Sequence, residues 1–180
     1  AILKEARAIV RDYFLILASP WRPPAWMKSN NNGLAGGPLL DEYKSPWGQH
    51  YIKFAEAYDK QGLPLWAISV QNEAMAVQTW ESCVYTAQQE RDFIRDYLGP
   101  RLERSPYNHL KLIAWDHNRD LLFQRASTIM ADPQAAKYVW GFGYHWYEPW
   151  TGGDMQFGNM KLTKEAYPEK ELVFTEGCVE

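Results

Sequence analysis

The hydrophobic positions along the chain fall into two alternating patterns. One is a short, nearly continuous apolar run, which is typical of a strand buried on both faces of a parallel sheet. The other is a repeat of apolar residues at helical spacing, which predicts an amphipathic helix. The runs predict five strands, at residues 14–19, 65–70, 110–115, 139–144 and 171–175. The repeats predict helices at residues 2–13, 46–60, 86–102, 120–131, 133–138 and 158–167.

This alternation of strands and helices predicts a parallel α/β sheet, either doubly wound or part of a (β/α)8 barrel. A doubly wound nucleotide-binding fold would carry a glycine-rich loop after its first strand. Here the first apolar run ends at Ser19-Pro20-Trp21, and no such motif occurs anywhere in the chain. A complete barrel needs eight strands and about 250 residues. With 180 residues and five strands, we expect one domain over residues 1–180 that forms an incomplete barrel.

Composition narrows the function classes. The 19 basic and 22 acidic residues give a net charge of −3, so binding to nucleic acid or to an anionic membrane has no electrostatic support. No apolar run approaches the ~20 residues that span a bilayer. Hydrophobic residues make up 46 % of the chain, which is enough for a core, and aromatic residues make up 15 %, which suits a protein that stacks flat ligands. Two cysteines, Cys83 and Cys178, cannot build a disulfide framework. One bridge between them is the alternative to two buried free thiols, which we expect.

Polar and aromatic groups follow each predicted strand, at the sheet edge where (β/α) barrels carry their chemistry. Among them, Glu73 and Glu176 come directly after long apolar runs. Either glutamate alone could be an ion-pair partner of Arg119 or a helix cap. Two carboxylates at one rim, with Asn72 and several aromatic rings nearby, instead favour glycosidic cleavage, which uses one protonated acid and one ionised carboxylate. The four histidines are scattered without the H-E-x-x-H spacing of a metallohydrolase, so we expect no metal and no cofactor.

Five segments of the chain together resemble glycoside hydrolase family 30. They are Ser19-Pro20-Trp21 with Trp26, Val70-Gln71-Asn72-Glu73, Trp115-Asp116-His117-Asn118, His145-Trp146-Tyr147 and Phe174-Thr175-Glu176-Gly177-Cys178. The family includes glucosylceramidases, bacterial β-glucosidases and β-1,6-glucanases. The resemblance implies a retaining β-glycosidase in which Glu73 is the acid/base and Glu176 is the nucleophile. A non-catalytic carbohydrate-binding or inactive fragment of such an enzyme is the alternative.

The resemblance also implies roles for other residues. Asn72, Trp26, His145 and Tyr147 correspond to substrate-binding positions, with Asn72 bonding the sugar 2-hydroxyl and Trp26 lining the glycone pocket. The resemblance also suggests that Asp116 and Arg119 support the site through a buried network. The family usually has proline after its Asn-Glu pair, whereas this chain has Ala74, which puts the positioning of the acid in question.

Relative to the family, the chain covers about strands 3–7 of the barrel. Strands 1, 2 and 8 and the β-sandwich side domain have no counterpart in it. We therefore expect exposed sheet edges that are covered by the rest of a longer parent chain, by a complementary barrel fragment or by a second copy of the chain. The expected substrate is a β-linked glucoside, glucan or glycolipid. The chain opens inside a predicted helix and carries no secretion signal, so it does not indicate a compartment, although family members are often secreted or lysosomal.

Overall fold

The computed structural model describes residues 2–10 and 14–178 of the chain. Its strands are β1 (Leu17–Ala18), β2 (Ala67–Ser69), β3 (Lys111–Asn118), β4 (Val139–His145) and β5 (Glu171–Phe174). The α-helices are α1 (Ile2–Val10), α2 (Lys44–Lys60), α3 (Ala87–Phe93), α4 (Gly99–Glu103), α5 (Leu122–Met130), α6 (Pro133–Ala136) and α7 (Phe157–Ala166). A π-helical segment, η4 (Ile94–Leu98), joins α3 to α4, and short 3-10 helices are η2 (Ala25–Met27), η3 (Asp41–Tyr43), η5 (Arg119–Leu121) and η6 (Glu148–Thr151).

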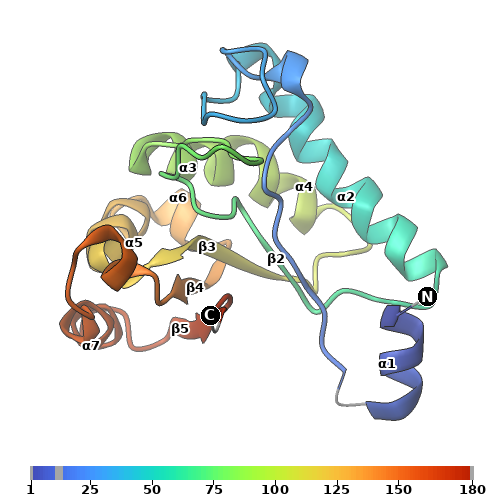
Figure 1. The fold of residues 1–180 in the computed structure, drawn as a ribbon. Helices are drawn as coiled ribbons and strands as arrows, with labels where there is room; N and C mark the ends of the chain where they lie inside the picture. The colour runs from blue at the N-terminus through green and yellow to red at the C-terminus, as the bar shows by residue number, and fades with distance from the viewer. Residues whose placement is uncertain (1, 11–13, 179–180) are drawn as a thin grey trace.

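The five strands form one sheet in the order β1-β2-β3-β4-β5, and every neighbouring pair is parallel. A doubly wound sheet would reverse its strand order at a switch point, and this sheet does not. The helices form an arc around the strands, from α2 through α4 and α3 to α5 and α7 (Figure 1). The fold is therefore five consecutive strands of a (β/α) barrel with their outer helices.

Several predicted elements have different bounds in the structure. The first predicted strand, 14–19, pairs only over β1, and β3 continues to Asn118, beyond the apolar run that predicted it. The predicted helix at 86–102 is one continuous helical segment, but its hydrogen bonds widen to a π pattern over η4 just before Pro100. The part of the first predicted helix at residues 11–13 lies outside the described residues.

Local sequence signals explain where two of the helices begin. Thr86 and Gln89 form a reciprocal capping box at the start of α3, which satisfies backbone groups that the first turn leaves free. Asp132 accepts a hydrogen bond from the backbone of Gln134 at the start of α6, and Pro133 follows at the first helical position. These caps fix where α3 begins after the loop that follows β2, and where α6 begins after α5.

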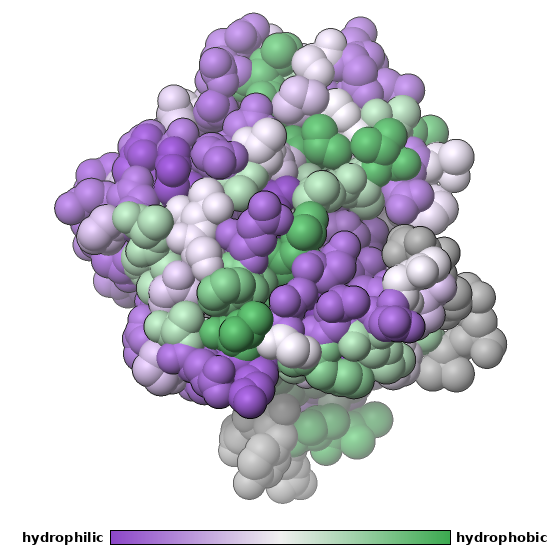
Figure 2. Space-filling model, turned by 90° about the vertical axis from the view of Figure 1, so that its left-hand side faces the viewer, coloured by the Kyte–Doolittle hydropathy of each residue, from purple (hydrophilic) through white to green (hydrophobic). Residues whose placement is uncertain are grey.

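The core lies between the sheet and the arc of helices. The central strands β2 and β3 are almost wholly buried, and Leu122, Ala126 and Ile129 of α5 pack into the same core. Figure 2 shows the outer side of the arc, over α5 and α7, as hydrophilic residues mixed with smaller apolar patches. In the part of the chain that the structure describes, no helix combines the length and apolarity needed to cross a bilayer.

The sheet has two edges within the described residues, because β1 pairs only with β2 and β5 only with β4. A cavity of about 440 Å³ lies beside β1, lined mainly by apolar side chains that include Leu3, Ile16 and Phe54. Its lining includes neither Glu73 nor Glu176. How these edges are covered stays a prediction.

Both cysteines are free thiols, as expected. Cys83 is buried, and burial raises the pKa of its thiol to about 12. Cys178 is exposed, so the expectation that both thiols are buried is wrong for Cys178. The reason is that Cys178 lies beyond the end of the edge strand β5, which pairs only with β4 in the described part of the chain.

Candidate active site

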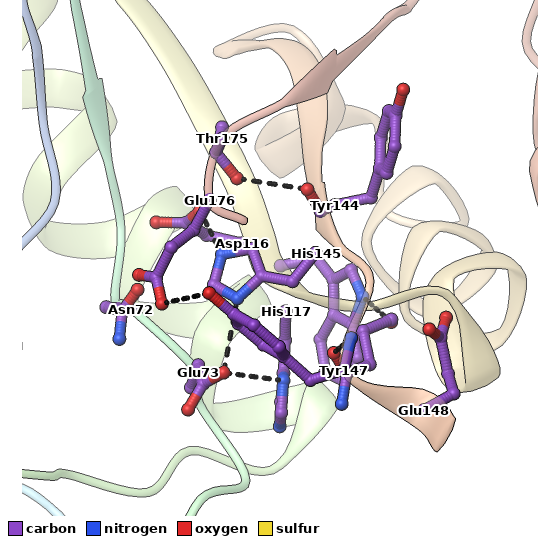
Figure 3. A network of polar contacts seen from close by, with 12 residues as sticks. Asn72, Glu73, Asp116, His117, Tyr144, His145, Tyr147, Glu148, Thr175 and Glu176 are labelled. Atoms are coloured by element: carbon purple, nitrogen blue, oxygen red, sulfur yellow. Dashed lines mark hydrogen bonds and ion pairs between the residues drawn. The ribbon is translucent and has the colours of Figure 1, made fainter. Parts of the chain in front are cut away.

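The predicted site residues gather at the carboxyl ends of the strands. Asn72 and Glu73 follow β2, Asp116 lies near the end of β3, His145 ends β4, and Glu176 follows β5. Figure 3 shows these side chains in one cluster, together with Tyr147 and His117. Because parallel strands end at the same edge, residues more than a hundred positions apart in the sequence meet here.

The backbone around Glu73 is held in an unusual conformation. Its φ of 46° is in the left-handed region, which non-glycine residues rarely adopt. Its backbone N–H donates to the carbonyl of Asp116 at 2.9 Å, and the Asn72 N–H donates to the carbonyl of Pro20 at 2.9 Å. These bonds tie the loop after β2 to both neighbouring strand ends. Such strain in a well-held segment is common at functional sites.

The loop that continues from Glu73 is also fixed by backbone hydrogen bonds. The N–H of Ala76 donates to the Glu73 carbonyl at 2.8 Å, and the N–H of Tyr85 donates to the Ala74 carbonyl at 2.8 Å. Ala74 itself is fully buried. The loop is therefore anchored although it lacks the proline that the family usually has.

A bulge in β3 brings two successive residues into the cluster. The β3–β4 register shifts between Trp115 and His117, and Trp115 and Asp116 have φ values of 70° and 52°. Side chains normally alternate between the two faces of a strand, and a bulge breaks this alternation. As a result, Asp116 contacts His145 while the adjacent His117 points its Nδ1 toward Glu73.

A buried ion pair behind the sheet supports the bulge. The Glu90 carboxylate of α3 accepts the Trp115 N–H at 2.7 Å and pairs with Arg125 of α5 at 3.3 Å. Burial raises the pKa of Glu90, and the contacts with Arg125 and Trp115 oppose that shift. The Glu90 carboxylate therefore bonds the backbone of the β3 bulge, and the sequence around the bulge does not indicate this partner.

His145 bridges two carboxylates. It is fully buried, its Nδ1 lies 3.2 Å from Glu73 Oε1, and its Nε2 lies 3.1 Å from Asp116 Oδ1. Burial lowers the pKa of His145, but the hydrogen bonds to Asp116 and Glu73 outweigh it and raise the pKa to about 9. Burial also raises the pKa of Asp116, yet the contact with His145 brings it below the usual value. His145 therefore contacts both carboxylates, and its substrate-binding role stays a prediction.

Tyr147 holds the second glutamate. Its hydroxyl donates to Glu176 Oε1 at 3.0 Å and accepts the backbone N–H of Cys178 at 3.1 Å. Burial, with the neighbouring Cys178 and Glu176, raises the pKa of Tyr147, so the hydroxyl stays protonated. The Tyr147 backbone N–H donates to the Asn118 side chain at 2.8 Å, which fixes the loop after β4.

Arg119 forms a buried ion pair that the sequence did not indicate. Its guanidinium and backbone N–H donate to Glu148 at 2.6–2.8 Å, and both side chains are almost inaccessible. It does not pair with Glu73 or Glu176 in the contacts that the structure describes. The predicted supporting network thus has two parts, Asp116 with His145 and Arg119 with Glu148. Glu148 was missed as a site residue, and only its place after an apolar run could have indicated it.

Asn72 lies in the cluster, whereas the ring contact described for Trp26 is with Tyr43 and not with a residue of the cluster. Trp26 is 56 % exposed in η2, with its ring edge-on to Tyr43 at a centroid distance of 5.0 Å. Asn72 is only 5 % exposed, beside Glu73. Their substrate-binding roles stay predictions.

The same region holds the donor atoms of a candidate metal site. Three residues, Glu73, His117 and His145, each offer one ligand atom, and these three atoms lie within 4.8 Å of one another.

Comparisons with known proteins agree with this architecture. A family model described as the glycosyl hydrolase family 30 TIM-barrel domain matches residues 1–180. The chain is 34 % identical over 172 residues to the lysosomal acid glucosylceramidase of Mus musculus, covering 91 % of this chain and 33 % of that protein. Among solved structures, SrfJ from Salmonella typhimurium superposes with a TM-score of 0.89 at 36 % identity, covering 98 % of this chain and 38 % of that one. The endo-β-1,6-glucanase BT3312 superposes with a TM-score of 0.87 at 29 % identity, covering 98 % and 40 %.

The chain spans about a third of the length of the curated relatives that it matches. The predicted fold class, part of a TIM barrel, is confirmed by the family model and by the parallel five-stranded sheet.

Proposed function

Because the chain belongs to glycoside hydrolase family 30, we propose that it supplies the two catalytic carboxylates of a retaining β-glycosidase. The single observation that carries the proposal is the pairing of each strand-end glutamate with a residue at the end of β4. His145 contacts Glu73, and Tyr147 contacts Glu176. This arrangement gives two carboxyl groups fixed positions at one barrel rim, as a double displacement requires.

Glu176 is the nucleophile in this proposal. Its Oε1 accepts the Tyr147 hydroxyl, which orients the carboxylate and leaves the other oxygen for attack on the anomeric carbon. The new bond joins Glu176 to that carbon while the bond to the leaving oxygen breaks.

Glu73 is the acid/base. It gives its proton to the leaving oxygen in the first step, and the hydrogen bond from His145 to Oε1 holds its carboxyl group in place. In the second step, Glu73 takes a proton from water, the resulting hydroxide attacks the anomeric carbon, and Glu176 is released as a carboxylate. The sugar therefore keeps its β configuration.

The relatives support a proposal for the substrate class. One is a glucosylceramidase and one solved structure is an endo-β-1,6-glucanase. We propose a β-linked glucoside for this chain, either in a glucan or on a lipid or other aglycone.

The proposal is tested by the dependence of a Glu73→Ala variant on leaving-group quality. Alkyl glucosides need protonation of the leaving oxygen, so we expect kcat/KM on them to fall by about 10²–10⁴-fold. Activated aryl glucosides need little protonation, so their glycosylation rate should fall far less. Glu81→Ala, which removes an exposed carboxylate from the loop that follows Glu73, is the control and should leave both rates unchanged. Equal losses on both substrate kinds would contradict an acid/base role for Glu73.

A further inference from the structure

We propose that Glu73, His117 and His145 form an inhibitory binding site for Zn²⁺ or a similar late first-row divalent cation. The inhibitory part of this proposal rests on the proposed function of Glu73, whereas the binding part does not. Nothing in the proposed glycosidase mechanism uses His117, which leaves its imidazole available for another role.

The spacing of the three donor atoms is close to that of a metal ligand set. Glu73 Oε1 lies 3.2 Å from His145 Nδ1 and 3.7 Å from His117 Nδ1, and all three atoms fall within 4.8 Å of one another. Ligands in a tetrahedral zinc site, with bonds of about 2.0–2.2 Å, stand roughly 3.3–3.6 Å apart. Small side-chain rotations are therefore enough to bring the three atoms onto one cation.

The surroundings of His145 match those of a metal-bound histidine. Such a ligand usually donates its second ring N–H to a carboxylate, which fixes the ring and makes the other nitrogen a better ligand. His145 has this partner already, because its Nε2 lies 3.1 Å from the buried Asp116 carboxylate. The cation takes the place of the proton that His145 Nδ1 shares with Glu73.

His117 provides an independent observation. Its Nδ1 is buried and has no hydrogen-bond partner among the described residues, and it points toward Glu73 at a distance beyond hydrogen bonding. Buried polar atoms are nearly always bonded, so an orphan nitrogen aimed at a carboxylate and a second imidazole is what an unfilled ligand set would show. The β3 bulge is what turns this nitrogen into the cluster.

The donor set selects the kind of cation. Two imidazoles and one carboxylate suit Zn²⁺, Cu²⁺ or Ni²⁺, whereas Mg²⁺ and Ca²⁺ prefer sites made of oxygen ligands. A cation bound here would hold Glu73 Oε1, and a carboxylate held by a metal cannot supply or accept the proton of glycoside cleavage. Occupancy should therefore inhibit the enzyme reversibly.

Calorimetric titration of the protein with ZnCl₂ tests the binding part. We expect one Zn²⁺ per chain, no comparable binding of MgCl₂, and at least tenfold weaker Zn²⁺ binding for both His117→Gln and Glu73→Gln. His109→Gln is the control, because His109 is an exposed histidine outside the cluster. The Zn²⁺ affinity of this variant should match that of the wild type. Thermal unfolding followed by circular dichroism checks that each variant is folded. If only one of the two ligand variants folds, its Zn²⁺ affinity alone tests the site. Absence of one-to-one binding, or an affinity unchanged in both ligand variants, would overturn the site.

Hydrolysis of an aryl β-glucoside in the same ZnCl₂ series tests the inhibitory part. Activity should fall with the half-saturation seen by calorimetry and return when EDTA is added. Stoichiometric binding at this site without loss of activity would overturn the inhibitory role and contradict the assignment of Glu73 as acid/base. An active enzyme that binds no Zn²⁺ would overturn the metal site and leave the proposed function standing.

Discussion

Replacement of Glu148 by Gln should destabilise the protein strongly, because it breaks a buried ion pair. Glu148 Oε1 accepts the Arg119 backbone N–H at 2.6 Å and Nε at 2.8 Å, and Oε2 accepts Nη2 at 2.8 Å. The exposed fractions are 1 % for Glu148 and 3 % for Arg119. In Glu148→Gln the side chain keeps its shape but leaves the guanidinium buried without a counter-charge.

The magnitude follows from the cost of an uncompensated buried charge. Removing one partner of a buried pair costs about 3–5 kcal/mol, and Gln retains one acceptor oxygen, so we expect a loss of ~3 kcal/mol. For a domain of this size, that corresponds to a fall of roughly 6–12 °C in melting temperature. Asp120→Asn removes an exposed carboxylate beside Arg119 and should change the free energy of unfolding by less than about 0.5 kcal/mol.

Urea unfolding at neutral pH measures both variants. Burial raises the pKa of Glu148, but the hydrogen bonds from Arg119 outweigh it and hold the pKa below its usual value. The pair therefore contributes fully above the unfolded pKa of about 4.3, and its contribution is lost as the pH falls through the folded pKa. The difference between wild type and Glu148→Gln should shrink below about pH 4. A loss at neutral pH no larger than that of Asp120→Asn would refute the reasoning.

Two further variants probe the site and the sheet. Tyr147→Phe removes the hydroxyl that donates to Glu176. A hydrogen bond to a charged group contributes about 1.5–3 kcal/mol, so we expect kcat to fall roughly 10- to 160-fold. A change within twofold would argue against a catalytic effect of this contact. Gly141→Ala places a Cβ 2.5 Å from the Glu171 carbonyl oxygen, which forces β4 and β5 apart, so urea unfolding should show a loss of about 1–3 kcal/mol. Gly158→Ala is the matched control, because its Cβ would meet no atom within 4 Å apart from its chain neighbours and its own helix backbone. An equal loss there would contradict the steric argument.

The long apolar runs made much of the fold predictable. A run such as Leu65–Val70 can only be buried on both faces, so its place in a parallel sheet and the position of the residues after it follow directly. This is why the sequence indicates that Asn72, Glu73 and Glu176 share one edge of the sheet. In the structure, Asn72 and Glu73 follow β2 and Glu176 follows β5, so all three lie at the carboxyl ends of the strands, as predicted.

The arrangement within the site depends on contacts that no local pattern carries. The bulge at Trp115 and Asp116 needs left-handed backbone at non-glycine residues, which propensity argues against. Its support comes from Glu90, on a helix earlier in the chain. The place of His117 beside Glu73 depends on that bulge, and an alternating strand would have pointed His117 to the opposite face from Asp116.

The assignment of Glu176 as nucleophile is tested most directly by trapping the glycosyl-enzyme intermediate. An activated 2-deoxy-2-fluoro-β-glucoside forms the covalent intermediate but hydrolyses slowly, so the adduct accumulates and can be located by peptide mass spectrometry. The account predicts one glycosyl group per chain, on the peptide that contains Glu176, with the peptide that contains Glu73 unmodified. An adduct on Glu73 or on any other residue, or a hydrolysis product of inverted configuration, would contradict it.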